Sequence, residues 1–180
     1  MITCQYARLM AAYNQWMNVK LYDAAGKLSP QELASDRKAF FGSILATLNH
    51  ITVADTIWLK RFATHPGKHA ALDPIRRLPV PGSFDMILFR NLGAMAKQRK
   101  LLDVAMSEWA AALTENDLQH VLHYKNSKGV PAQKRFSGLL LHFFNHQTHH
   151  RGQLATLLSQ VALDLGVTDL LALIPDEIEE

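Results

Sequence analysis

The 180-residue sequence has a single cysteine, Cys4. One cysteine excludes an internal disulfide and every metal or redox motif built from several cysteines. No stretch approaches the roughly 18 uninterrupted apolar residues that a membrane span needs. The N-terminal MITCQYARLMAAYNQWM lacks a basic run followed by a short apolar segment and a small-residue cleavage site. We therefore expect no signal peptide, no membrane association and a cytoplasmic protein.

The chain also lacks a large excess of charge of one sign, because 19 basic residues against 16 acidic ones give a net charge of +3. This small surplus, without a recognition motif or a long basic stripe, argues against a nucleic-acid-binding protein. The chain has no Gly-x-Ser-x-Gly elbow and no phosphate-binding glycine loop. Apolar residues make up 48% and charged residues 19%, which is typical of a compact soluble chain. The length suits a single domain over residues 1–180.

Apolar residues recur at steps of three and four along four long stretches, which predicts four amphipathic helices. Their approximate ranges are 3–25, 36–63, 84–113 and 136–163. Ser29 and Pro30 suit the cap and first position of a short helical turn, and Ser83 can cap the third long helix. These elements predict an all-α fold, a four-helix bundle.

The segments between the helices have a different composition. Residues 64–82 hold four prolines and two glycines, which predicts an extended connection and a crossover rather than a simple up-down order. Residues 118–136 contain short extended runs around an Asn-Ser-Lys-Gly turn, which predicts a small β-hairpin between the third and fourth long helices. We expect the apolar DLLALIP of the tail, residues 166–180, to pack against the body.

Histidine is abundant: the chain has nine, and His142, His146, His149 and His150 all lie on the last predicted helix. On a helix that turns about 100° per residue, His150 projects within the apolar stripe and His146 at its margin, whereas the other two fall outside it. Two histidines at i and i+4 lie one turn apart, so both imidazoles can reach one ion. The alternative is a pair of core histidines hydrogen-bonded to neighbours. In both cases the ring nitrogens need a metal ion or a hydrogen-bond partner, because burying an unbonded polar group costs free energy.

A third histidine, His50, lies in the middle of the second predicted helix. It projects about 120° from the centre of that helix's main stripe, but Val53, Ala54 and Ile57 make its own side apolar as well. His50 could therefore face the interior, although periodicity does not require it. Together with His146 and His150 it would provide three nitrogen ligands and leave positions for water or substrate. Imidazoles suit Zn, Ni, Fe or Cu, so the ligands do not select the metal.

Other polar residues offer weaker candidates. Asp55 interrupts the stripe of the second helix, and we interpret it as a partner of the metal ligands or as a buried carboxylate paired with a base such as Arg61. Gln153 and Tyr13 are further polar groups that could face a cavity. We expect solvated positions for His65 and His69, which lie in the Pro/Gly-rich connection. His120 and His123 at the hairpin could line a pocket mouth, but we expect a surface role for them as well.

Four segments, in order, resemble the DinB family, the damage-inducible metal-binding bundles related to the YfiT-like proteins. They are YNQWMNVKLYDAA, FFGSILATLNHITVADTIWLKRF, HFFNHQTHHRGQLATLL and GVTDLLALIPDE. The resemblance implies a four-helix bundle with a divalent metal (Zn, Ni or Fe) held by three histidines. Carried over residue by residue, these ligands are His50, His146 and His150. The resemblance also implies a homodimer.

Some proteins similar to this family are thiol-dependent transferases, which join a low-molecular-weight thiol to a small electrophilic acceptor. The resemblance therefore implies a metal-dependent thiol S-transferase, with a hydrolase as the lesser option. The alternative is a non-catalytic stress-response or binding module in which the metal is structural or incidental. Neither the residues nor the resemblance assigns a general base, the thiol, or roles for His142 and His149.

Overall fold

A computed structural model describes residues 2–176. Its main elements are four long helices: α1 (Cys4–Ala25), α3 (Ile44–Phe62), α5 (Leu92–Ala112) and α7 (Phe136–Ser159). The short elements are α2 (Pro30–Ala34), η1 (Ala70–Leu72), α4 (Asp73–Arg77), α6 (Glu115–Gln119), β1 (Val121–Lys125), β2 (Pro131–Arg135) and η2 (Leu170–Leu173). Within the described part of the chain, no helix is long and apolar enough to cross a membrane. The fold is all-α apart from one small antiparallel sheet.

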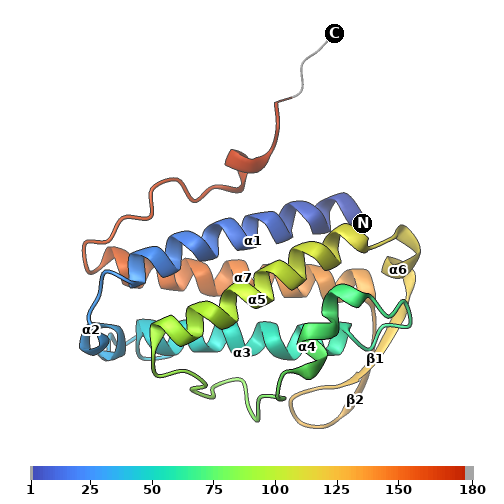
Figure 1. The fold of residues 1–180 in the computed structure, drawn as a ribbon, viewed down its shortest axis with the longest axis horizontal. Coiled ribbons are helices and arrows are strands. Elements are labelled where there is room, and N and C mark those ends of the chain that lie inside the picture. Colours follow the sequence, from blue (N-terminus) through green and yellow to red (C-terminus); the bar gives the residue numbers. More distant parts are fainter. Residues whose placement is uncertain (1, 177–180) are drawn as a thin grey trace.

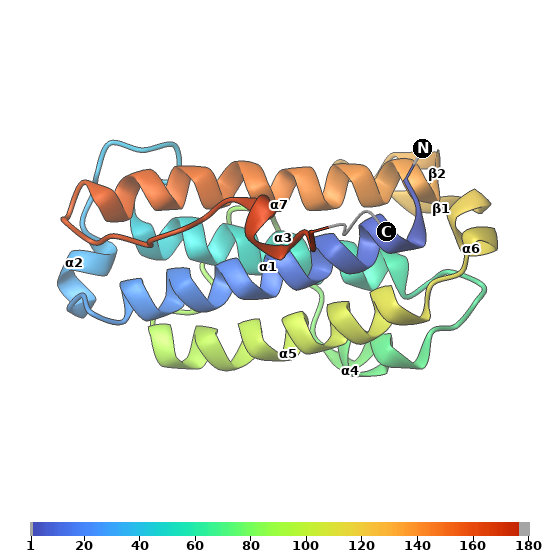
Figure 2. The same ribbon diagram turned by 90° about the horizontal axis from the view of Figure 1, so that it is seen from above.

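The four long helices lie side by side, and each packs against two others. Helix α1 contacts α5 and α7, and α3 contacts the same two helices from the other side. Figures 1 and 2 show α1 and α7 running in one direction and α3 and α5 in the other. Because α3 and α5 are parallel, the connection between them must return along the length of the molecule, as the predicted crossover requires.

Two long helices begin later than predicted. Helix α3 begins at Ile44, where the Ser43 side chain accepts a hydrogen bond from the Ala46 amide. The preceding residues cannot continue a helix, because Lys38 and Gly42 have φ values of 56° and 79°. Helix α5 begins at Leu92, and its cap is Asn91 rather than Ser83. Ser29 does cap α2 with a capping box, as predicted, and Pro30 is its first residue.

The predicted hairpin is present. Strands β1 and β2 pair antiparallel, with Val121 opposite Arg135 and Lys125 opposite Pro131. Gly129 has a φ of 75° in the connecting turn, a backbone conformation that glycine adopts without strain. The turn is closed by the Asn126 amide, which donates to the Val130 carbonyl over 2.9 Å.

The interior has two apolar clusters separated by a polar layer. One cluster contains stacked rings such as Phe62 and Trp109, whose centroids are 5.2 Å apart, and the other includes Leu48 and Leu158. Between them the long helices contribute buried polar side chains, which we call the polar layer: Asn14, Asn18, Asp55, Arg99, Asp103, Gln147 and Arg151. His50, His146 and His150 come from the same stretches of α3 and α7 as this layer.

The described part of the tail packs on α1, as predicted. Tyr13 donates its hydroxyl hydrogen to the Thr168 carbonyl over 2.8 Å. Lys20 donates to the Leu165 carbonyl, and Leu170 packs at the edge of the first apolar cluster. Figure 2 shows η2 lying over α1. Residues 177–180 of the predicted segment lie outside the described part of the chain.

Candidate metal centre

The structure brings together the three histidines that the sequence singled out. One ring nitrogen from each of His50, His146 and His150 lies within 4.8 Å of the other two. The ring centroids of His146 and His150 are 4.4 Å apart along α7, and His50 on α3 has its centroid 4.4 Å from that of His150. His50 and His150 are buried and His146 is half-buried. The cluster therefore lies at an edge of the protein interior.

Hydrogen bonds orient two of these rings. Nδ1 of His50 lies 2.8 Å from the Phe84 carbonyl oxygen, and Nδ1 of His150 lies 2.8 Å from Gln153 Oε1. Carbonyl oxygens only accept, so we assign the ring hydrogen to Nδ1 in both residues. Each Nε2 then presents a lone pair, and the two Nε2 atoms are 3.2 Å apart. Two nitrogens bound to one tetrahedral ion at 2.0–2.1 Å would be about 3.3 Å apart, so the arrangement fits a shared metal.

The electrostatic environment keeps the three rings neutral. Burial, together with the neighbouring His150 and His50, lowers the pKa of His146 to about 3. Burial is also the main cause that lowers the pKa values of His50 and His150. Neutral imidazole is the form that binds metal ions, so the histidines are ready for coordination at neutral pH.

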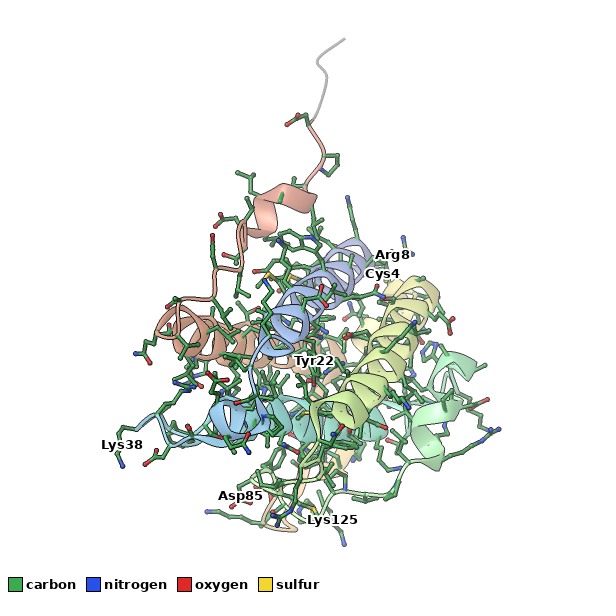
Figure 3. All side chains as sticks on the ribbon, turned by 60° about the vertical axis from the view of Figure 1, so that its left-hand side comes forward. Cys4, Arg8, Tyr22, Lys38, Asp85 and Lys125 are labelled. Atoms are coloured by element: carbon green, nitrogen blue, oxygen red, sulfur yellow. The ribbon has the colours of Figure 1, made fainter. Side chains whose placement is uncertain are left out.

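A cavity of about 580 Å³ opens beside the histidines. Phe41 forms one wall, with its ring stacked on that of His50 at a centroid distance of 4.1 Å. Phe40, at the rim, is 85% exposed. The remaining walls come from α3, the α4–α5 connection, the hairpin and α7: Trp58, Arg61, Phe84, Asp85, Tyr124, Asn126, Ser127 and His142. Figure 3 shows Asp85 and Lys125 on the same side of the molecule, where the connection and the hairpin meet.

The two other histidines of α7 lie outside the cluster, as helix geometry predicted. His142 is exposed and packs edge-on against Trp58, with ring centroids 5.1 Å apart. His149 is exposed, and its Nε2 lies 3.4 Å from the Gln153 amide nitrogen. His142 therefore lines the cavity without joining the three convergent nitrogens.

Asp55 does not pair with Arg61, one of the two interpretations that the sequence suggested. Its partner is Arg99 on α5, with an Nη1–Oδ2 distance of 2.5 Å, and both side chains are buried. Asp55 and Arg61 are six positions apart, about 240° around the helix, so they project to different sides of α3. Arg61 instead lies over the rings of Trp58 and Tyr124. Asp55 still influences the centre, because its charge opposes the lowering of the pKa of His150.

The rest of the polar layer is bonded around this ion pair. Arg99 also reaches Asp103 over 2.9 Å, and Asn18 donates to the same carboxylate oxygen over 2.9 Å. Arg151 donates to Asn14, which donates in turn to Asp103 over 3.1 Å. Two carboxylates and two guanidinium groups are thus buried together with balanced charge, as buried ions require.

Neighbours of the histidine rings complete the site, and the sequence did not reveal two of them. The Phe84 carbonyl and the Phe41 ring come from loops, and no local pattern marks them as neighbours of His50. Gln153 was one of several polar candidates; its position three residues after His150 on the same helix is the signal that selects it.

Tyr13, another candidate, bonds to the tail instead. Cys4 is buried, which raises its pKa to about 11, so it is not a thiolate nucleophile.

Two of the histidines expected to be solvated are not. His65 is 3% exposed, and its ring lies 4.8 Å from that of Phe136. His69 is partly buried beside it, with ring centroids 5.5 Å apart. The chain after α3 folds back under α6, and a Pro/Gly-rich composition does not reveal this packing. His120 is half-buried against His65, whereas His123 is exposed, as expected.

The fold and the site define a class: an all-α protein with a three-histidine candidate metal centre at the wall of a cavity. The chain belongs to the DinB family, whose family model matches residues 1–177. Protein DinB of Bacillus subtilis (strain 168) is 22% identical over 164 residues, which cover 91% of this chain and 91% of that relative. No solved structure matches the chain.

Proposed function

We propose that this protein is a metal-dependent enzyme with a DinB-type four-helix bundle. In this proposal His50, His146 and His150 hold a divalent ion (Zn, Ni or Fe), and the enzyme transfers a low-molecular-weight thiol to a small electrophilic acceptor. One observation carries the proposal. Three neutral imidazoles converge within 4.8 Å beside a cavity of about 580 Å³, which leaves space for a substrate next to the ion.

The chain's own residues have separable tasks in this proposal. One ring nitrogen from each histidine would hold the ion, while the Phe84 carbonyl and Gln153 hold the rings of His50 and His150 in orientation. When bound, the metal supplies Lewis acidity, which lowers the pKa of a coordinated thiol so that it reacts as a thiolate. In the transfer, a sulfur–carbon bond forms, the bond from that carbon to its leaving group breaks, and the thiol proton goes to solvent.

The cavity walls favour particular substrates. Trp58, Tyr124 and Phe41 provide aromatic surface for an apolar acceptor. Arg61, whose guanidinium carbon lies 4.6 Å from the Trp58 ring centroid, adds a positive charge. Low-molecular-weight thiols commonly carry carboxylates, and a guanidinium group binds a carboxylate well. This combination supports a small anionic thiol and an apolar electrophile as the substrate pair.

The metal itself is tested by elemental analysis of protein purified without a nickel column. We expect His146→Ala to lose the ion of this centre, because two imidazoles remain on different helices. The matched control is His149→Ala, which removes an exposed histidine of the same helix. A His146→Ala protein with an unchanged metal content would contradict the proposed ligand set.

The open coordination position is tested in the cobalt-substituted protein. Titration with thiols should change the visible spectrum, because a sulfur ligand alters the cobalt ligand field. The alternative, a non-catalytic stress-response or binding module with a structural ion, predicts a filled coordination sphere and no spectral response. It also predicts a large fall in melting temperature on chelation.

A further inference from the structure

A second cluster of metal-ligating side chains lies at the far end of α3. His65 follows the helix, His69 precedes η1, and Asp117 lies on α6. One ligand atom from each lies within 4.8 Å of the other two. His65 follows the end of α3 at Phe62, which lies 12 residues or about 18 Å beyond His50 on a helix that rises 1.5 Å per residue. The cluster is therefore separate from the three-histidine centre.

One atom of this cluster lacks a partner. The His69 side chain is 9% exposed, and its Nε2 has no hydrogen-bond partner among the described residues. The nearest carboxylate oxygen, Asp117 Oδ2, is 3.8 Å away, too far for a hydrogen bond. A buried ring nitrogen without a partner costs free energy, and such atoms in folded proteins call for an explanation such as a bound ion.

His65 is also oriented for coordination. Its Nε2 lies 3.3 Å from the Asp117 carbonyl oxygen, to which it can donate a hydrogen. Its Nδ1 then bears the lone pair, and this atom lies 3.8 Å from Asp117 Oδ1. Nδ1 accepts one hydrogen bond, from the Gly67 amide over 3.0 Å, which an ion would replace. An imidazole held by a backbone carbonyl at one nitrogen is the usual form of a histidine ligand.

The space between the three ligand atoms exists because residue 67 is glycine. A Cβ at this position would lie 3.0 Å from His69 Nε2 and 3.1 Å from both His65 Nδ1 and Asp117 Oδ1. The three atoms thus line the space directly above the Gly67 backbone, which a larger side chain would fill. A zinc ion binds nitrogen and oxygen ligands at about 2.0–2.2 Å, so the side chains need to close by about 1 Å around it.

We propose that His65, His69 and Asp117 form a second divalent-metal site, of the Zn²⁺ type, with two imidazoles and one carboxylate. The ion would join the end of α3, the 66–69 loop and α6, and would neutralise part of the Asp117 charge. This site is independent of the proposed thiol transfer, because none of its residues lines the cavity beside His50.

The test counts zinc ions per chain after Zn²⁺ loading and desalting of untagged protein. We expect two in the wild type and one in His69→Ala, which lacks a ligand. Gly67→Ala keeps all three ligands but fills the space between them, so it should also retain one. Lys68→Ala, an exposed neighbour in the same loop, is the matched control and should retain two.

His146→Ala separates this site from the three-histidine centre. His146→Ala should retain one ion, and His146→Ala combined with Gly67→Ala should retain none. If only the second site binds metal, the wild type retains one ion and Gly67→Ala none. An equal zinc content in Gly67→Ala, His69→Ala and the wild type would overturn the proposal, and this comparison does not depend on the folding of His146→Ala.

Discussion

Gln153 is the side chain that holds His150 in position, through the 2.8 Å contact between Oε1 and Nδ1. Partners of this kind orient a ligand ring and raise its basicity, and their loss typically weakens metal binding about 10–100-fold. We therefore predict that Gln153→Ala lowers zinc affinity within this range, measured by competition with a chromophoric chelator. Gln153→Glu, which keeps an acceptor oxygen, should retain the affinity. Equal affinities for Gln153→Ala and the wild type would show that the contact does not orient the ligand.

The lowered histidine pKa values predict how stability depends on pH. In the folded, metal-free protein His146 stays neutral down to a pKa of about 3, whereas in the unfolded chain it binds a proton near pH 6.5. Below pH 6.5 the unfolded state therefore binds more protons than the folded state, and stability falls as the pH falls. His50, His150, His65 and His142 contribute in the same direction.

Urea unfolding of the chelated protein at pH 7.5 and pH 5.5 measures this effect. We expect a lower free energy of unfolding at pH 5.5, with about 1 kcal/mol of the difference assigned to the half-buried His146. His146→Ala should reduce the difference by that amount. A wild type that is equally stable at both pH values would contradict the neutral, buried state of these rings.

At the scale of helices, the polar layer joins α1, α3, α5 and α7 through ion pairs and hydrogen bonds between polar side chains. Asp55 on α3 and Arg99 on α5 are both buried, and Asp103 is the second carboxylate of Arg99. Removing Asp55 leaves two buried guanidinium groups with one carboxylate, and an uncompensated buried charge costs about 3–5 kcal/mol. We predict a loss of this size in Asp55→Ala, measured by chemical denaturation.

Two variants control this prediction. Asp55→Ala combined with Arg99→Met removes one charge of each sign, and Asp103 keeps its hydrogen bonds from Asn14 and Asn18, so the double variant should recover part of the lost stability. Asp73→Ala breaks the exposed ion pair with Arg76, which should contribute at most about 1 kcal/mol. If Asp55→Ala and Asp73→Ala have equally small effects, the buried pair does not stabilise the contact between α3 and α5.

At the scale of the molecule, the crossover between α3 and α5 has two consequences for function. Its later part brings the Phe84 carbonyl to His50 and closes one side of the cavity. Its first part holds His65 and His69 against α6. The cavity therefore combines walls from five segments: the loop before α3, α3 itself, the crossover, the hairpin and α7.

This composite cavity leads to a prediction about substrate charge. Arg61 is held over Trp58 and by the Lys125 carbonyl, which accepts its hydrogen bond over 3.0 Å. We expect Arg61→Met to weaken binding of a carboxylate-bearing thiol to the cobalt-substituted protein about 10-fold, because one charge-assisted contact is lost. A neutral thiol of similar size should bind the variant and the wild type alike. Equal weakening for both thiols would show that Arg61 shapes the cavity without recognising charge.

Local patterns were sufficient for the helices, the hairpin and one pair of ligands. His146 and His150 share a face because an α-helix places residues i and i+4 one above the other, whatever the rest of the fold does. The beginnings of α3 and α5 were less well predicted. Ser83 and Asn91 are both good caps, and only the packed structure selects between them. The homodimer that the resemblance implied stays a prediction.

The sequence by itself determined that a histidine pair would project from the last long helix toward the apolar interior, because helical periodicity is a local property. Only the tertiary structure decided that His50 faces this pair, that Asp55 pairs with Arg99, and that His65 is buried beside Asp117. Each of these contacts depends on how separate segments are rotated and packed against one another. Periodicity describes the faces of a helix but does not state which face meets which neighbour.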